Sequence, residues 1–322
     1  MNKTLRVLLA VLVGIGLFGA PAAADAFTIG LGDQKLGMWQ DPRFRALGIE
    51  HVRLVVAWDQ VLKGDFSRYD RWMAAAHSRR ADVLLTIEHA LKRPRRLPTL
   101  RQYRQVVRTL HDHYPWVTAM GTWNEPNHYR QPTYHRARLT GRYYNIMLEE
   151  CPGCRVVAAD LLGFRNTSAW VAKFLKTARR PKIWGFHNYN DANRKSLPLS
   201  QTDTAALLRL VRGNIWITEA GGIVRFSERF RGKRKDERQA AVAMRRTFAL
   251  ARLSRRIKRV YLYQWDAERK FVRWDSGLVR ANGRARPALY VVRKEINRQR
   301  RARGLRSVPP LSARLTRRLP LP

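Results

Sequence analysis

The sequence predicts an α/β protein whose main domain is a (β/α)₈ TIM barrel, and three observations predict it. Short runs of apolar, β-branched and aromatic residues recur along the chain, helical patterns separate them, and eight such runs lie between residues 27 and 265. Strands that alternate with helices are typical of a parallel sheet. Eight such units are the number that closes into a barrel.

The predicted elements follow one another in a regular order. We expect strands over residues 27–30, 51–58, 83–87, 117–122, 155–160, 183–189, 215–219 and 260–265. Segments with a helical apolar period predict helices over residues 70–79, 100–113, 140–148, 167–177, 202–211 and 236–253. Because chemistry on this fold lies at the C-terminal ends of the strands, residues at those ends are the functional candidates.

The first 26 residues have the features of a secretion signal. Lys3 and Arg6 precede an apolar stretch from Leu8 to Leu17, and small residues surround Ala24. That stretch is shorter than the roughly 20 residues that span a bilayer, so we expect no transmembrane span. An uncleaved anchor is the alternative. The signal (1–26) would be removed to leave a secreted, extracellular protein, with association at the cell surface as a variant.

The rest of the chain predicts one domain and a tail. Residues 27–296 are close to the ~250 residues of a (β/α)₈ barrel. From Asn297 the composition becomes basic and contains prolines, and we expect residues 297–322 to form a disordered tail.

The chain is strongly basic, with a formal net charge of +39. Such a charge attracts polyanions without specificity, including anionic cell-envelope polymers. Basic residues occur both on loops of the expected catalytic end (Arg93, Arg95) and on the opposite end (Arg179, Arg180). Arginine also dominates over lysine, as GC-rich coding would produce. The charge therefore does not identify the cleft, and it predicts no specific nucleic-acid site.

The two cysteines form one CxxC motif, Cys151 and Cys154. This spacing occurs in redox dithiols and in half of a zinc site. No second CxxC accompanies it, and it lies in a loop before a strand rather than at a helix N-terminus. In an exported protein we interpret it as a local structural disulfide, remote from the chemistry.

A glutamate follows the fourth predicted strand, in the run WNEPN from Trp123 to Asn127. Pro126 biases Glu125 toward an extended backbone, so we expect the strand to end there. A neighbouring tryptophan would give its carboxyl group an apolar wall that raises the pKa, as a general acid requires. The amide of Asn124 could hold a hydroxyl group of a ligand.

A second glutamate, Glu219, follows the seventh predicted strand in the same way. Glycosidases place two carboxyl groups around one bond, about 5–5.5 Å apart when one is a nucleophile and roughly 6.5–9.5 Å apart when a water lies between them. The sequence does not give this distance. A single glutamate at a strand end would be a solvated terminus, but two such residues on a barrel predict catalysis.

These two motifs, WNEPN and TE, resemble those of the clan of retaining (β/α)₈ glycoside hydrolases that includes cellulases, mannanases and β-xylosidases. The resemblance covers essentially the whole expected barrel. It implies that Glu125 is the acid/base, that Glu219 is the nucleophile and that Asn124 binds the sugar 2-hydroxyl. It implies no cofactor, and the sequence has neither metal-ligand spacing nor a phosphate-binding glycine loop.

Further positions match the clan in chain order. Arg53 resembles the arginine that keeps the nucleophile ionised, with a structural ion pair as the alternative. His187 and Tyr189 resemble a His-x-Tyr pair whose hydroxyl lies near the nucleophile, although such a pair also fills ordinary strands. Trp265 resembles a tryptophan that stacks on a sugar ring, and a core tryptophan would look the same. His89 and Trp58 are weaker candidates for lining the cleft.

The sequence thus predicts a secreted retaining glycosidase that acts on a polysaccharide or oligosaccharide, with β-linkages favoured. One alternative is a transglycosylase on the same scaffold. Another is a non-catalytic barrel that binds glycans or polyanions, which would not need both glutamates and Asn124. The sugar and its linkage depend on loop shapes that sequence patterns do not resolve.

Overall fold

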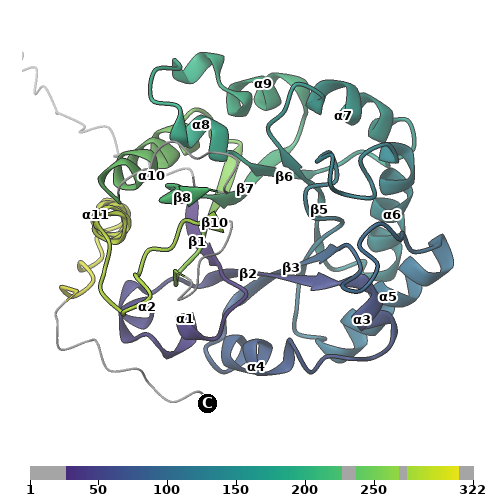
Figure 1. The fold of residues 1–322 in the computed structure, drawn as a ribbon, viewed down its shortest axis with the longest axis horizontal. Coiled ribbons are helices and arrows are strands. Elements are labelled where there is room, and N and C mark those ends of the chain that lie inside the picture. The colour runs from purple at the N-terminus through teal and green to yellow at the C-terminus, as the bar shows by residue number, and fades with distance from the viewer. Residues whose placement is uncertain (1–26, 227–236, 268–273, 312–322) are drawn as a thin grey trace, which may run out of the picture.

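The computed structural model describes residues 27–226, 237–267 and 274–311. Within them, eight parallel strands form a closed barrel, and each strand pairs with the next along the chain (Figure 1). The predicted (β/α)₈ fold is therefore confirmed. The barrel strands are β1 (Thr28–Gly32), β2 (His51–Ala57), β3 (Asp82–Glu88), β4 (Ala119–Gly121), β5 (Arg155–Leu162), β6 (Ile183–His187), β7 (Asn214–Ala220) and β9 (Ile257–Tyr263).

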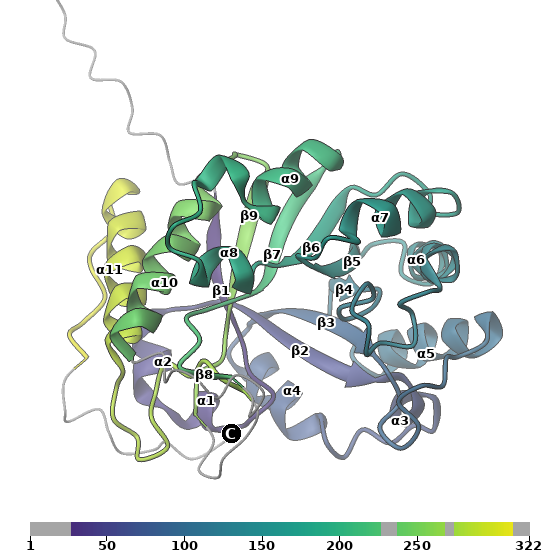
Figure 2. The same cartoon turned by 45° about the horizontal axis from the view of Figure 1, so that its top comes forward.

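Helices surround the ring of strands, as the two views of the ribbon show (Figures 1 and 2). They are α1 (Gly37–Gln40), α2 (Pro42–Leu47), α3 (Trp58–Leu62), α4 (Asp70–Ser78), α5 (Leu100–His113), α6 (Ala137–Glu150), α7 (Thr167–Leu175), α8 (Tyr189–Asn193), α9 (Asp203–Leu210), α10 (Glu237–Ala251) and α11 (Pro287–Ala302), with a 3₁₀ turn η1 (Leu199–Gln201). Two short strands, β8 (Arg225–Phe226) and β10 (Trp274–Asp275), pair antiparallel to each other. Among the described residues, no helix combines the length and apolarity that a membrane crossing requires.

Alternation along β3 shows which side chains face the inside of the barrel. Val83, Leu85 and Ile87 belong to the large apolar cluster that packs strands against helices. Leu84 belongs instead to a small separate cluster inside the barrel, together with residues of β4, β5, β7 and β9. Because side chains alternate between the two faces of a strand, Thr86 and Glu88 continue the inward row toward the C-terminal end.

The N-terminal end of the barrel is closed by ion pairs around Asp82. The Asp82 carboxylate lies 2.8 Å from Nη2 of Arg155, 2.8 Å from Nη2 of Arg259 and 3.1 Å from Nδ1 of His51. The guanidinium of Arg259 also lies over the ring of Trp216, at 4.1 Å from its centroid. The side chains of this ion-pair cluster therefore satisfy one another.

The expected boundary of the tail at residue 296 is wrong. Helix α11 continues to Ala302, because buried residues such as Ile296 and Gln299 extend its inner face beyond Asn297. The Asn297 side chain then accepts a hydrogen bond of 2.7 Å from the backbone of Val308, which is buried. The remainder of the expected tail (312–322) and the expected signal (1–26) lie outside the described residues.

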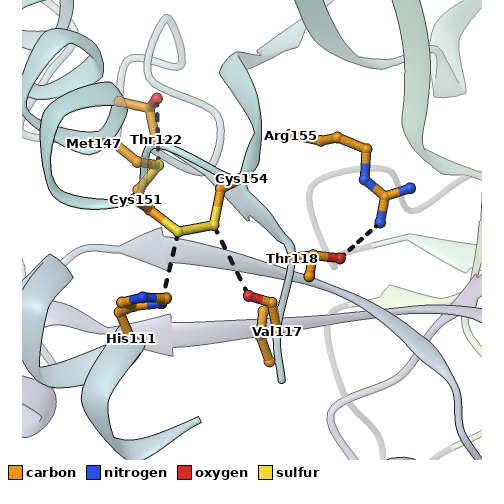
Figure 3. The surroundings of a disulfide bond; sticks show 8 residues. All are labelled: His111, Val117, Thr118, Thr122, Met147, Cys151, Cys154 and Arg155. Atoms are coloured by element: carbon orange, nitrogen blue, oxygen red, sulfur yellow. Dashed lines mark hydrogen bonds between the residues drawn. A yellow bond between two sulfur atoms is a disulfide. The ribbon is translucent and has the colours of Figure 1, made fainter. Parts of the chain in front are cut away.

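Cys151 and Cys154 form a disulfide across the short turn between α6 and β5, with Cα atoms 5.3 Å apart (Figure 3). His111 lies 3.7 Å from the Cys151 sulfur, and the carbonyl oxygen of Val117 lies 3.9 Å from the Cys154 sulfur. The disulfide precedes β5, so it lies at the end of the barrel opposite Glu125 and Glu219. This placement agrees with a structural role.

Candidate active site

The backbone turns sharply at Glu125. Strand β4 ends at Gly121, and Asn124 still bridges to Asp160 of β5 before Glu125 adopts a φ of +47°. The expectation of an extended Glu125 is therefore wrong. A side chain other than glycine in this left-handed region costs roughly 1–2 kcal/mol, and such strain persists where the surroundings hold it. Here it marks the residue that the sequence singled out.

The other residues of the WNEPN run fix this turn in place. Asn127 is fully buried, donates 2.7 Å to the carbonyl of Leu162 and accepts 2.9 Å from the same residue's N–H. Trp123 is also buried and stacks on Tyr143 of α6, with ring centroids 5.9 Å apart. Trp123 and Asn127 thus anchor the loop, and Asn124 and Glu125 carry the polar groups of the site.

Glu219, the sixth residue of β7, is held by two donors. Nη1 of Arg53 donates to its Oε1 at 2.7 Å, and the Tyr189 hydroxyl donates to its Oε2 at 3.1 Å. Arg53 also donates from Nη2 to the side-chain oxygen of Asn124 at 2.9 Å. The sequence-predicted residues Arg53, Asn124, Tyr189 and Glu219 therefore form one connected network.

Asp160, at the inner face of β5, completes this network and was missed by the sequence analysis. Its Oδ2 accepts 2.6 Å from Nη2 of Arg53 and 3.3 Å from the Thr86 hydroxyl. Gly121 and Gly185 leave the necessary space, because a Cβ at either position would lie 2.4 Å from Thr86 Oγ1 or 2.0 Å from Asp160 Oδ1. The buried Arg53 guanidinium is thus shared between two carboxylates.

His187 links the two glutamates. Its Nδ1 lies 3.0 Å from Oε1 of Glu125 and 3.8 Å from Oε2 of Glu219. Burial opposes protonation of this imidazole, but the charge of Glu219 and the hydrogen bond to Glu125 outweigh it, so the pKa of His187 is raised. The structure thus brings His187 together with Glu125 and Glu219.

The predicted rise of the Glu125 pKa is wrong for this state of the protein. Burial alone would raise it, but the hydrogen bond and charge of His187, together with the charges of His128 and Arg53, lower the pKa of Glu125. The proton therefore resides on the imidazole, and Glu125 and His187 form a coupled pair.

The two glutamates lie close together at the mouth of the barrel. One carboxylate oxygen of Glu125, one of Glu219 and a nitrogen of His187 lie within 4.8 Å of one another. Carboxyl groups whose nearest oxygens are this close agree with the ~5–5.5 Å separation of retaining glycosidases. The arrangement can attack a carbon between the glutamates from one side and protonate its leaving group from the other.

The same three side chains have the donor types of a metal site, but their surroundings favour acid–base chemistry. Both oxygens of Glu219 already accept hydrogen bonds, and the Arg53 cation lies directly against one of them. A cation in that position repels a divalent ion. These groups therefore suit proton transfer better than metal binding.

Solved structures with the same fold are glycoside hydrolases. A family 39 glycoside hydrolase from Bacteroides cellulosilyticus matches with a TM-score of 0.57 and 15% identity over 84% of this chain and 63% of its own. GH5_18 from Streptomyces cattleya in complex with GlcNAc gives 0.61 and 16% over 86% and 81%. Xylanase 10B from Thermotoga petrophila in complex with xylobiose gives 0.58 and 13% over 84% and 95%.

This protein has the fold of glycoside hydrolase barrels. No family model and no curated protein matches the sequence, so the likeness is one of structure. The chain spans less than two thirds of the length of the family 39 structure. The predicted resemblance is confirmed at the level of the fold.

The expected roles of two tryptophans do not agree with their positions. Trp265 is 0% exposed, packs edge-on against Phe44 and donates its indole N–H to Asp41 at 3.1 Å. Trp58 is 1% exposed. Neither indole presents a face to a ligand in this structure, so both are core residues.

A different tryptophan, Trp274 of β10, lies beside the residue that donates to Glu219. Its ring contacts that of Tyr189 edge-on at 4.6 Å, and Tyr189 donates to Glu219. Trp274 is only partly buried. His89 is likewise partly exposed, and its Nδ1 lies 3.3 Å from the side-chain amide of Gln131.

A third carboxylate, Glu88, was not among the predicted site residues. It is the last residue of β3, follows Thr86 in the inward row, and its side chain is 25% exposed. Burial raises its pKa to about 7, with Arg53 opposing and the charges of Glu219 and Glu125 adding to the rise. The mouth of the barrel therefore holds three neighbouring carboxylates.

Proposed function

We propose that this protein is a retaining glycoside hydrolase in which Glu219 is the nucleophile and Glu125 the acid/base. One observation carries the proposal: the carboxylates of Glu125 and Glu219 lie within 4.8 Å at strand ends of a (β/α)₈ barrel. The glycoside hydrolase neighbours support it through the fold. We propose a β-linked polysaccharide or oligosaccharide as the substrate, in line with the motif resemblance.

In the first step, a Glu219 oxygen forms a bond to the anomeric carbon while the bond from that carbon to the leaving oxygen breaks. Arg53 and Tyr189 hold the Glu219 carboxylate in place for this attack. The leaving oxygen takes a proton from Glu125, which receives it from His187 along their hydrogen bond of 3.0 Å.

In the second step, water attacks the same carbon and releases the sugar from Glu219. Glu125, now ionised, takes the proton of that water and returns it to the pair with His187. Asn124, whose side-chain oxygen is held by Arg53, retains an amide N–H₂ group that can donate to the sugar 2-hydroxyl. Protons and bonds are thereby restored to the starting state.

The test is covalent trapping with a panel of 2-deoxy-2-fluoro β-glycosides, read by intact-protein mass spectrometry and peptide mapping. We expect one adduct on wild-type Glu219, no adduct on Glu219→Gln, and slow release of the trapped adduct from Glu125→Gln. The matched control is Glu50→Gln, an exposed glutamate before β2 at the opposite end of the barrel, which should react as wild type. Trapping at another residue would reject the assignment.

We also propose that the protein is exported after removal of residues 1–26. The charged start, the apolar stretch and the small residues around Ala24 support it. The test is N-terminal sequencing of the protein from the culture medium and from washed cells of its host. A mature N-terminus near Phe27 agrees with the proposal, whereas a chain that retains Met1 inside the cell contradicts it.

A further inference from the structure

We propose that Glu88 selects a sugar with a free amino group, binding its ammonium ion beside the two catalytic glutamates. This inference rests on the proposed function and deepens it, since it names the class of substrate. It uses a group to which the two-step mechanism gives no role.

The position of Glu88 places it in the substrate site. It ends the inward row of β3, and the Asn124 backbone N–H donates to the carbonyl of the preceding residue, Ile87, at 2.9 Å. Strand β3 pairs with β4, which leads to Asn124 and Glu125, and Thr86 of the same inward row donates to Asp160. The partial exposure of Glu88 leaves it open to a ligand.

Within residues 27–226, 237–267 and 274–311, no N–H or O–H group donates a hydrogen bond to the Glu88 carboxylate. The nearest basic atom is Nδ1 of His89 at 3.6 Å. Burial lowers the pKa of His89, so this imidazole is neutral at pH 7. A quarter of the Glu88 side chain is exposed, so a ligand can reach this carboxylate and supply the donors that the described residues do not.

The charge balance of the site favours a cation over a neutral or acidic group. Glu88, Glu125 and Glu219 contribute three carboxylates. The two cationic groups of the site are already engaged, Arg53 with Glu219 and Asp160 and protonated His187 with Glu125, so Glu88 is the carboxylate left for a further cation. A uronate or sulfate group would meet like charges here, whereas an ammonium would be attracted to all three. A hydroxyl donates one hydrogen bond but brings no charge.

The test measures binding without turnover, so it stands apart from the trapping experiment. The probes are methyl β-glucosaminide and methyl β-galactosaminide, their N-acetylated forms and the parent methyl glycosides, titrated at pH 8 by ligand-observed NMR. We expect wild type to bind an amino glycoside at least about 10-fold more tightly than its N-acetylated and hydroxyl counterparts. This preference should vanish in Glu88→Gln and persist in Glu50→Gln.

Three results would overturn the proposal. They are equal binding of amino and N-acetylated probes by wild type, a preference that survives Glu88→Gln, and no binding of either amino glycoside. Successful trapping at Glu219 with any of these results would leave the glycosidase in place and remove the amino-sugar specificity. Failed trapping together with a preference for amines would support the amino-sugar specificity and count against the glycosidase assignment.

Discussion

The two ends of β3 each carry a carboxylate, and their surroundings are opposite. Asp82, at the first residue, has two arginines and a histidine around it, and these outweigh the effect of burial and hold its pKa well below the usual range. Glu88, at the last residue, has no donor among the described residues, and burial raises its pKa to about 7. One strand therefore contains a carboxylate that the fold stabilises and one that it leaves destabilised.

Strand β3 therefore has a structural carboxylate at one end and a candidate ligand-binding carboxylate at the other. A satisfied ion-pair cluster closes the N-terminal end of the barrel and needs no ligand. At the C-terminal end, the strained backbone of Glu125 and the raised pKa of Glu88 both cost stability near neutral pH, and sites that bind ligands are where such costs persist. The following substitutions test this division, beginning with the largest expected effect.

Replacing His187 tests whether its imidazole holds the proton that Glu125 delivers to the leaving group. His187→Asn keeps a hydrogen-bond donor near Glu125 but removes the titrating group, so kcat/KM for glycosides with poor leaving groups should fall by about 10²–10³-fold. Activated dinitrophenyl glycosides, which need no acid, should be much less affected.

The pH profile of kcat/KM gives the matching readout. The pKa of His187 is raised, so in wild type the pair loses its proton, and activity declines, only as pH rises above the ordinary histidine value. In His187→Asn this alkaline decline should move to lower pH. An unchanged alkaline limb would contradict the role of His187 as the proton store.

Replacing Asp160 tests whether Arg53 needs this second carboxylate in order to hold Glu219 and Asn124 in place. Asp160→Asn removes one of the two carboxylates on the guanidinium, which frees Arg53 to shift from the geometry that holds Glu219 and Asn124. We expect kcat to fall by about 10²-fold with little change in KM, because misplacement of reacting groups by about 1 Å has this effect. A purely structural role would instead lower the thermal midpoint and leave the kcat of the folded fraction unchanged.

The sequence predicted the parts of the site that follow a strand-end pattern. The eight strands, Glu125 and Glu219 followed from apolar runs and from the acidic residues at their ends. Arg53, His187 and Tyr189 were expected only from the resemblance to the glycoside hydrolase clan. Glu88 is also an acid at the end of a strand, so the strand-end pattern identifies it as a candidate. The sequence analysis named the adjacent His89 instead. Asp160 also had a signal, a single acid at the end of the apolar run Val156–Ala159.

Other features could not be predicted, because they depend on contacts between distant segments. Trp265 and Trp274 are equally aromatic in sequence, and only packing against Phe44 or Tyr189 places one in the core and the other near Glu219. The fall in the Glu125 pKa depends on His187, 62 residues away. The continuation of helix α11 past Asn297 was not predicted, because its few buried residues there lie among many arginines.

Replacing Asp82 tests the satisfied end of β3. Asp82→Asn leaves Arg155 and Arg259 without their shared carboxylate, and we expect a loss of about 2 kcal/mol of stability at pH 7, a fall of roughly 4–8 °C in the thermal midpoint. The pKa of Asp82 is lowered by folding, so its contribution is complete above its unfolded value of about 4 and is lost progressively as pH falls toward the lowered folded pKa. Thermal unfolding at pH 7 and pH 3 should show a smaller difference at pH 3 than at pH 7, whereas equal midpoints at pH 7 would refute it.

Replacing Glu88 tests the unsatisfied end and should have the smallest effect, with the opposite sign. The folded pKa of about 7 lies above the ordinary glutamate value of about 4.5, so the contribution of Glu88 is most favourable below pH 4.5 and becomes unfavourable as pH rises toward 7. Glu88→Gln removes that penalty, and we expect a gain of about 1–2 kcal/mol at pH 8, a few degrees in the thermal midpoint, and no gain at pH 4.5.

Thermal unfolding of wild type, Glu88→Gln and the exposed control Glu50→Gln at both pH values provides the measurement. A Glu88→Gln variant less stable than wild type at pH 8 would mean that the carboxylate has a structural partner, as Asp82 does. An amino glycoside should stabilise wild type more than Glu88→Gln and so reduce the gain at pH 8. That result would link the stability cost of Glu88 to ligand binding. The destabilised carboxylate would then be the one that the ligand satisfies.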